Sequence, residues 1–153
     1  MPQNWQPVNP DFADRVRRSF ARQGFMALLG AELTRVEPGL VEIQAGYRLE
    51  LTQQHGYFHA GVAGTLADNC GGYAAFTLMP ADASVLTVEY KLNLLAPGKG
   101  QRLMAQGRVL RPGRSLTVCR TEVWAVDGGQ KTLCAAGQMT LMTLAGKSDR
   151  PPA

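Results

Sequence analysis

The chain has 153 residues, 45% of them apolar, which suits one globular domain with a buried core. Its net charge of +4 comes from scattered Arg and Lys without a long basic run, which argues against nucleic acid and suits a phosphate-bearing small ligand. The sequence contains no signal-peptide pattern and no apolar run of the ~20 residues that span a membrane, and its cysteines lack metal-ligand spacing. We therefore expect a cytoplasmic protein with reduced thiols, no bound metal and no membrane partner.

Residues 1–10 are polar and proline-rich and are expected to form a flexible leader. Apolar residues at roughly helical spacing predict one amphipathic helix over residues 11–27, with its arginines on a solvated face. Strands are predicted over residues 29–36 and 40–47, separated by a turn at Glu37-Pro38-Gly39, and a loop follows over residues 48–58.

Residues 59–76 read as a helix despite four glycines. At 100° per residue, Asp68 shares a stripe with Gly61, Gly64, Gly71 and Gly72, and bulkier residues occupy the opposite side. Glycine is tolerated in a helix where a backbone or a ligand must come close. Asp68 is then either a structural carboxylate bonded to a neighbouring backbone or subunit, or a catalytic carboxylate facing a substrate.

The start of this helix favours the catalytic alternative. His59 and Ala60 lie where unpaired N–H groups and the positive dipole end could hold an anion or a developing oxyanion. A carboxylate two turns further along the same helix suits acyl transfer or thioester hydrolysis.

Four segments with period-two alternation follow, over residues 85–94, 102–110, 116–126 and 132–143, with short Gly-containing turns between them. They predict an antiparallel meander, and residues 146–153 are expected to form a flexible tail. In the first segment Leu86, Val88 and Tyr90 are expected to face the core, with Thr87 on the opposite face. The chain is therefore predicted to be a single α+β domain over residues 11–145, with about six strands wrapped around a central helix.

These motifs resemble the hotdog fold, and specifically the phenylacetic-acid-degradation type of acyl-CoA thioesterase within the 4-hydroxybenzoyl-CoA thioesterase superfamily. The resemblance covers roughly residues 25–144. It runs through Leu29-Gly30-Ala31-Glu32-Leu33, the His-x-Gly helix start with Asp68 nine positions on, Leu86-Thr87-Val88-Glu89-Tyr90-Lys91-Leu92-Asn93 and Ala96-Pro97.

The resemblance implies roles at matching positions. Asp68 falls at the catalytic carboxylate, as nucleophile or general base, and the Ala60 N–H falls at the donor that polarises the thioester carbonyl. This chain has His59-Ala60-Gly61 where the family usually has His-Gly-Gly, but a main-chain donor survives that change. Gln53, or its neighbour Gln54, falls at an amide that binds the attacking water or the carbonyl. Thr87 falls at a hydroxyl that reaches the site from the other subunit.

Substrate contacts are expected from Gly61 and Gly72 on the helix, and from the turn that holds Arg111, Gly113 and Arg114. The two arginines could hold phosphates of coenzyme A, or could simply belong to an exposed basic hairpin. His59 either orients the helix start or acts as a base, and the first of these roles is favoured.

The sequence thus predicts an acyl-CoA thioesterase acting on an aryl- or medium-chain acyl group, with no cofactor because coenzyme A is part of the substrate. A homodimer that assembles to a tetramer is expected, because a single sheet leaves an edge to cover. One alternative is a non-catalytic acyl-CoA-binding or sensor protein. Another is a hotdog hydratase or dehydratase, whose Asp-x-Asn-Pro-x-His pattern is absent.

Overall fold

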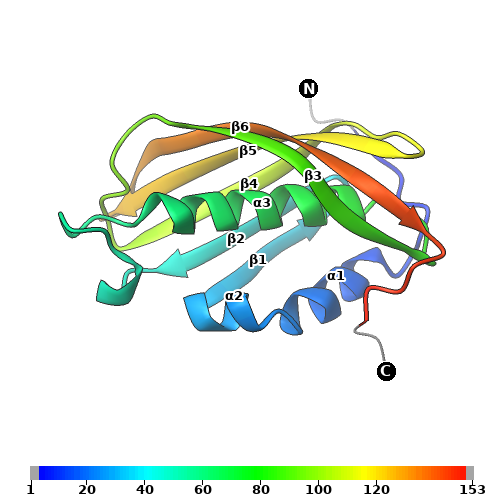
Figure 1. The fold of residues 1–153 in the computed structure, drawn as a ribbon, viewed down its shortest axis with the longest axis horizontal. Helices are drawn as coiled ribbons and strands as arrows, with labels where there is room; N and C mark the ends of the chain where they lie inside the picture. The colour runs from blue at the N-terminus through cyan, green and yellow to red at the C-terminus, as the bar shows by residue number, and fades with distance from the viewer. Residues whose placement is uncertain (1–3, 151–153) are drawn as a thin grey trace.

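The computed structural model describes residues 4–150, so the outermost residues of the predicted leader and tail lie outside it. A six-stranded sheet curves around one long helix, as Figure 1 shows. The helices are α1 (Phe12–Ala21), α2 (Gly24–Leu29) and α3 (Ala60–Phe76), with a short 3-10 turn, Leu49–Leu51, before α3. The strands are β1 (Ala31–Glu37), β2 (Leu40–Gly46), β3 (Ala83–Leu94), β4 (Arg102–Arg111), β5 (Leu116–Asp127) and β6 (Gln130–Ala145).

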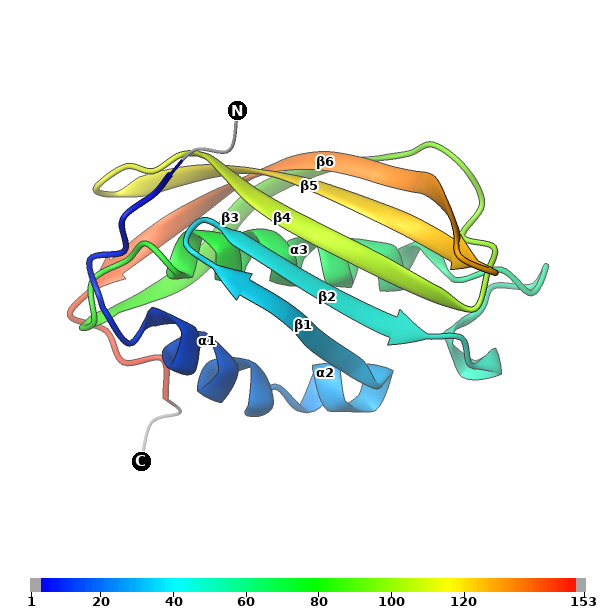
Figure 2. The ribbon, with the colours of Figure 1, turned by 180° about the vertical axis from the view of Figure 1, so that it is seen from behind.

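The sheet is antiparallel throughout, in the order β1-β2-β4-β5-β6-β3. The strand that follows α3 in sequence, β3, therefore lies at the far edge, and the next three strands fill the sheet from β2 toward β3 (Figure 2). This confirms the predicted α+β class, the six strands and the central helix, with strand bounds that differ by two residues or fewer at each end.

The core lies between α3 and the concave face of the sheet. Most of α3 is buried, and its backbone approaches the sheet closely. A Cβ on Gly107 of β4 would lie 2.4 Å from the backbone of Cys70, and a Cβ on Gly71 would lie 1.9 Å from Met139 Sδ. Gly71 is therefore a packing residue and does not belong to an open glycine face.

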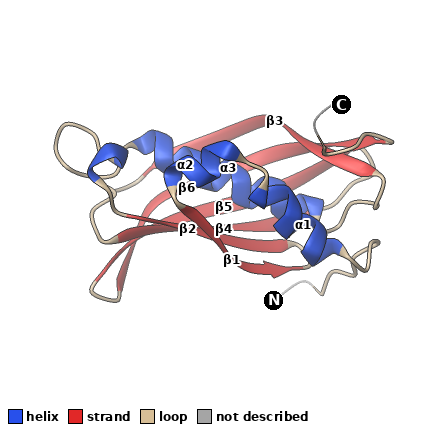
Figure 3. Ribbon diagram, turned by 90° about the horizontal axis from the view of Figure 1, so that it is seen from below, coloured by secondary structure: helices blue, strands red, loops and turns tan. Residues whose placement is uncertain are grey.

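The prediction of a single N-terminal helix over residues 11–27 is wrong in one respect. The structure breaks it at Gln23, whose backbone is extended, and α2 then continues to Leu29 before ending on Gly30 in the left-handed conformation. The Gln23 side chain donates to Asn69 and Tyr73 of α3, so a tertiary contact holds the break. Both helices contact β1, and α1 also contacts α3 (Figure 3).

Arg15 was expected on a solvated face of the first helix, and that expectation is wrong. The side chain is 8% exposed, and its guanidinium donates to the carbonyl oxygens of Phe76, Met79 and Pro80 at the end of α3. It also lies over the Phe76 ring, with 3.9 Å from Cζ to the ring centroid. Burial lowers the pKa of Arg15, but the carbonyl oxygens and the negative end of the α3 dipole compensate the charge.

We predict that Arg15→Ala lowers the free energy of unfolding by about 3 kcal/mol, because three carbonyl oxygens lose a charged donor inside the protein. Chemical denaturation measures this change. Arg17→Ala is the matched control, since Arg17 is exposed on the same helix and its one ion pair within the described residues is with Asp14 at 3.5 Å. The control should cost less than about 0.5 kcal/mol. Equal losses in the two variants would contradict this role for Arg15.

Candidate active site

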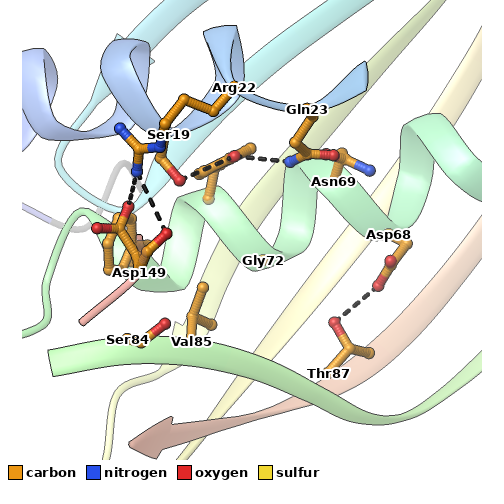
Figure 4. A pocket seen from close by; sticks show the side chains of 12 residues that line it. Ser19, Arg22, Gln23, Asp68, Asn69, Gly72, Ser84, Val85, Thr87 and Asp149 are labelled. Carbon is orange, nitrogen blue, oxygen red and sulfur yellow. Dashed lines mark hydrogen bonds and ion pairs between the residues drawn. The ribbon is translucent and has the colours of Figure 1, made fainter. Parts of the chain in front are cut away.

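Asp68 lies near the middle of α3, and its side chain is directed toward the edge strand β3 and not into the core. Thr87 Oγ1 of β3 donates to Asp68 Oδ1 at 2.8 Å, as Figure 4 shows. Both side chains belong to the same chain and are partly buried. The bond fixes one carboxylate oxygen and leaves the other available to a ligand.

This contact corrects the expectation for the faces of β3. Leu86 and Val88 are 51% and 45% exposed, whereas Thr87 turns inward to the helix of its own chain. The pairing of β3 with β6 shifts register between Thr87 and Glu89, which marks a β-bulge. After the bulge Tyr90 and Leu92 point inward, within 4.0 Å of where a Cβ on Gly64 would be. The expectation that Thr87 reaches the Asp68 of a partner subunit is therefore wrong.

A cavity of about 490 Å³ opens beside Asp68, between α3, β3 and the N-terminal helices. We call it the Asp68 pocket. Its walls include Asp68, Gly72, Thr87, Ser19 and Gln23. A Cβ on Gly72 would meet nothing within 4 Å, so this glycine leaves the wall of the pocket open, as the sequence predicted.

A hydrogen-bond network that the sequence did not reveal forms one wall of this pocket. Gln23 Nε2 donates to Asn69 Oδ1 at 2.8 Å and to the Tyr73 hydroxyl at 2.6 Å, and that hydroxyl donates to Ser19 Oγ at 3.2 Å. Burial raises the pKa of Tyr73, so its hydroxyl stays protonated at neutral pH. These residues come from segments far apart in the sequence, and no local spacing signals that they meet.

The start of α3 is built around His59. Its Nδ1 accepts a hydrogen bond from the Gly61 N–H at 2.8 Å, which makes His59 the N-cap of the helix. A Cβ on Gly61 would lie 2.9 Å from that nitrogen, so the glycine makes room for the cap. The Ala60 N–H has no hydrogen-bond acceptor within residues 4–150 and is free to bind a ligand.

Ala60 lines a second cavity, of about 500 Å³, which we call the Ala60 pocket. Gln53 and His55 contribute polar atoms to it, and Phe58, Leu95 and Leu103 are among its apolar walls. The Gln53 side-chain oxygen accepts from the His55 N–H, and its amide nitrogen has no hydrogen-bond acceptor within residues 4–150. Gln54 is exposed and does not line the pocket, so Gln53 is the glutamine that accompanies Ala60.

The predicted site residues therefore fall into two separate groups within one chain. Asp68, Gly72 and Thr87 line one pocket, while Ala60 and Gln53 line the other. Asp68 lies eight positions after Ala60 in α3, which corresponds to about 12 Å along the helix axis. A single carbonyl group cannot contact both residues of the same chain.

Arg111, Gly113 and Arg114 lie in and after the end of β4, in the turn before β5, and are exposed. They line neither the Asp68 pocket nor the Ala60 pocket. A Cβ on Gly113 would lie 2.3 Å from the Leu116 carbonyl oxygen, so the tightness of the turn explains this glycine.

Cys70 and Cys119 line neither pocket and are not suited to act as nucleophiles. Cys70 and Cys119 are buried, and burial raises the pKa of Cys119 to about 12 and that of Cys70 further.

Within residues 4–150 no group of three or more His, Cys, Asp and Glu side chains could hold a metal ion. In the same part of the chain, no helix has the length and apolar character needed to cross a membrane.

Comparisons of sequence and structure relate this chain to known thioesterases. Residues 55–132 match the family model of the thioesterase superfamily. A crystal structure of a thioesterase family protein from Silicibacter pomeroyi has 47% sequence identity and a TM-score of 0.87, over 88% of this chain and 99% of that chain. A protein of Saccharolobus solfataricus that carries a provisional esterase name is 33% identical over 70% of this chain and 69% of its own length.

A more distant structure extends the likeness in fold. The PaaI protein of the phenylacetic acid degradation operon of Escherichia coli has a TM-score of 0.79 at 18% identity, over 89% of this chain and 95% of that chain. The predicted resemblance to hotdog thioesterases is thereby confirmed. Since the family model covers half of the sequence and the relatives most of it, this chain belongs to the thioesterase superfamily and is a thioester hydrolase.

Proposed function

We propose that this protein is an acyl-CoA thioesterase, which hydrolyses an aryl- or medium-chain acyl-CoA to the free acid and coenzyme A. The enzyme acts in the cytoplasm and needs no bound cofactor. The observation that carries the proposal is Asp68, which is held by Thr87 at 2.8 Å beside an open pocket. The unpaired Ala60 N–H at the start of α3 supplies the complementary donor for a carbonyl oxygen.

In this mechanism the thioester carbonyl accepts a hydrogen bond from the Ala60 N–H, at the positive end of the α3 dipole. As a general base, Asp68 takes a proton from water while the water oxygen bonds to the carbonyl carbon. The carbon–sulfur bond then breaks, and the proton passes from Asp68 to the sulfur of coenzyme A. As a nucleophile, Asp68 instead attacks the carbonyl carbon, the carbon–sulfur bond breaks, and the released thiolate of coenzyme A takes a proton from solvent. Water then hydrolyses the resulting anhydride to the free acid and regenerates Asp68. The amide of Gln53 contacts the water or the carbonyl in either route.

The separation of Ala60 from Asp68 supports a homodimer, in which each site combines the helix start of one chain with the Asp68 and Thr87 of the other. The edge strand β3 supports the same assembly, because no other strand of residues 4–150 pairs with its outer side and it exposes Leu86, Val88 and Leu94. Two such dimers would form the tetramer that is expected from the sequence.

Asp68→Asn should keep the fold and lower kcat by about 100-fold or more, because the amide can accept the Thr87 hydrogen bond but cannot take a proton or attack. Steady-state hydrolysis and a thermal melt measure the two effects. Asp14→Asn, an exposed acid on α1, is the control. Near-normal kcat in Asp68→Asn would rule out a catalytic Asp68.

Ala60→Pro should remove the proposed oxyanion donor while leaving α3 intact. Proline is favoured at the first residue of a helix, and the extended backbone of His59 (φ −63°, ψ 139°) is compatible with a following proline. We expect kcat to fall by about 100-fold or more, whereas Ala60→Gly, which keeps the N–H, should stay near the normal rate.

Mixed dimers test the shared site. A dimer of Asp68→Asn with Ala60→Pro has one intact site and one doubly altered site, so it should exceed both parents by far. A dimer of Asp68→Asn with Thr87→Ala should show only the average of its parents, because Asp68 and Thr87 of one chain act together. No gain in the first mixture, with heterodimers verified by mass, would contradict the assembly.

Arg111→Ala combined with Arg114→Ala should raise KM for acyl-CoA and spare kcat, since phosphate contacts on the β4–β5 turn contribute equally to ground-state and transition-state binding. The same pair of changes should barely affect an acyl N-acetylcysteamine thioester, which lacks the nucleotide. Equal losses on the two substrates would instead indicate that the turn is structural.

A further inference from the structure

Residues 146–150, the tail segment, lie at the end of the Asp68 pocket that is remote from Asp68 (Figure 4). After β6 the chain turns at Gly146, which has the left-handed conformation (φ +65°), and then runs beside α1. Residues 145–148 and Arg150 are exposed, whereas Asp149 is partly buried and lines the pocket. Asp149 is therefore the residue through which the tail segment closes this end of the pocket.

One arginine holds the tail segment in place. Arg22 Nη2 donates to Asp149 Oδ2 at 2.6 Å and to the Asp149 carbonyl oxygen at 3.3 Å. Its Nη1 donates to the Arg18 carbonyl oxygen at 3.1 Å, which fixes the guanidinium on α1. Within the described chain, Arg22 supplies every hydrogen bond that residues 148–150 make outside their own segment. Because the paired side chains remain 38% and 24% exposed, the ion pair is weak enough to open without unfolding the domain.

The charges in the wall of the Asp68 pocket suit an uncharged group. Among the described residues that line it, Arg22 is the only cation, and it is accompanied by two acids, Asp68 and Asp149. These carboxylates repel a polyanion such as the nucleotide of coenzyme A, whereas the acyl group carries no phosphate. Phe76 and Val85 add apolar surface to the wall. The acyl group is therefore the part of the thioester that this pocket suits.

The room for an acyl group ends at the pair of Arg22 and Asp149. Asp68 and Phe76 line the same pocket and lie eight positions apart on α3, which corresponds to about 12 Å along the helix axis. Beyond the ion pair lies another cavity, of about 430 Å³, between α1 and the tail segment. Arg22 and Asp149 line both cavities, so separation of the pair would join them and lengthen the pocket.

We propose that Arg22 and Asp149 form a latch that limits the length of the acyl group, so that both are specificity-determining residues. The closed latch admits an aryl or medium-chain group. A longer chain has to press apolar surface against the paired charges or displace the tail segment, and either event costs binding energy. This inference rests on the function proposed above and adds a limit on acyl length to it. Neither side chain reaches the reacting atoms, so the latch acts on substrate choice and not on the chemical step.

The test compares kcat/KM for palmitoyl-CoA with kcat/KM for octanoyl-CoA or phenylacetyl-CoA, whichever the wild-type protein hydrolyses faster. In Asp149→Ala and in Arg22→Ala this ratio should rise about tenfold, because the tail segment no longer closes the pocket. Added salt should raise the ratio in the wild type by screening the pair, and should have no such effect in Asp149→Ala. Asp14→Ala is the matched control, since it removes another exposed ion pair of α1, and it should leave the ratio unchanged.

Exchanging the two charges separates a latch from a general role in folding. Arg22→Asp alone should behave like Asp149→Ala, whereas Arg22→Asp combined with Asp149→Arg should return the ratio toward the wild-type value. An unchanged ratio in both alanine variants, an equal change with the long and the short ester, or no return in the exchanged pair would overturn the latch while hydrolysis of the short ester continued. A wild-type protein that hydrolyses no acyl-CoA would instead overturn the proposed function itself.

Discussion

The close contact of α3 with the sheet is the constraint on which the rest of the structure depends. A Cβ on Gly107 would collide with the α3 backbone at Cys70, and a Cβ on Gly71 would collide with Met139, so neither the depth of the helix nor its rotation can change without repacking the core. Because 3.6 residues complete a turn, this fixed rotation also determines that Asp68 and Gly72 line the pocket beside the edge strand β3 instead of packing into the core. Arg15 holds the C-terminal end of the same helix by its carbonyl oxygens.

A helix held in this way presents its two functional regions to different cavities. The start of α3 faces the Ala60 pocket, whereas Asp68 faces the pocket between β3 and the N-terminal helices. The edge strand β3 connects these regions, since its bulge turns Thr87 toward Asp68 and also brings Tyr90 and Leu92 over Gly64. A site that needs both regions at one carbonyl group has to be assembled from two copies, which relates catalysis to the unpaired strand edge.

Much of this could be predicted from the sequence, because strand alternation, turn glycines and helix periodicity are local signals. The meander, the central helix and the isolated position of Asp68 follow from them. The remainder depends on contacts between distant segments. Nothing near Val88 announces a bulge, so the alternation of β3 assigned the wrong face to Thr87. Arg15 has the sequence context of a surface arginine, and only the end of α3, 61 residues away, gives it buried acceptors. Gln23 interrupts a helical pattern because its side chain bonds to Tyr73 of α3, 50 residues away in sequence.

The choice of histidine as the cap of α3 has an electrostatic consequence. An acceptor at Nδ1 requires a ring nitrogen without a proton, so in its neutral form His59 satisfies the Gly61 N–H without bringing a negative charge to the helix start. Aspartate, a common residue at this position, would satisfy the same donor but would place a carboxylate next to the Ala60 N–H. Such a charge would repel an oxygen that becomes negative during reaction. The neutral cap therefore preserves the positive potential of the helix terminus where the proposed chemistry requires it.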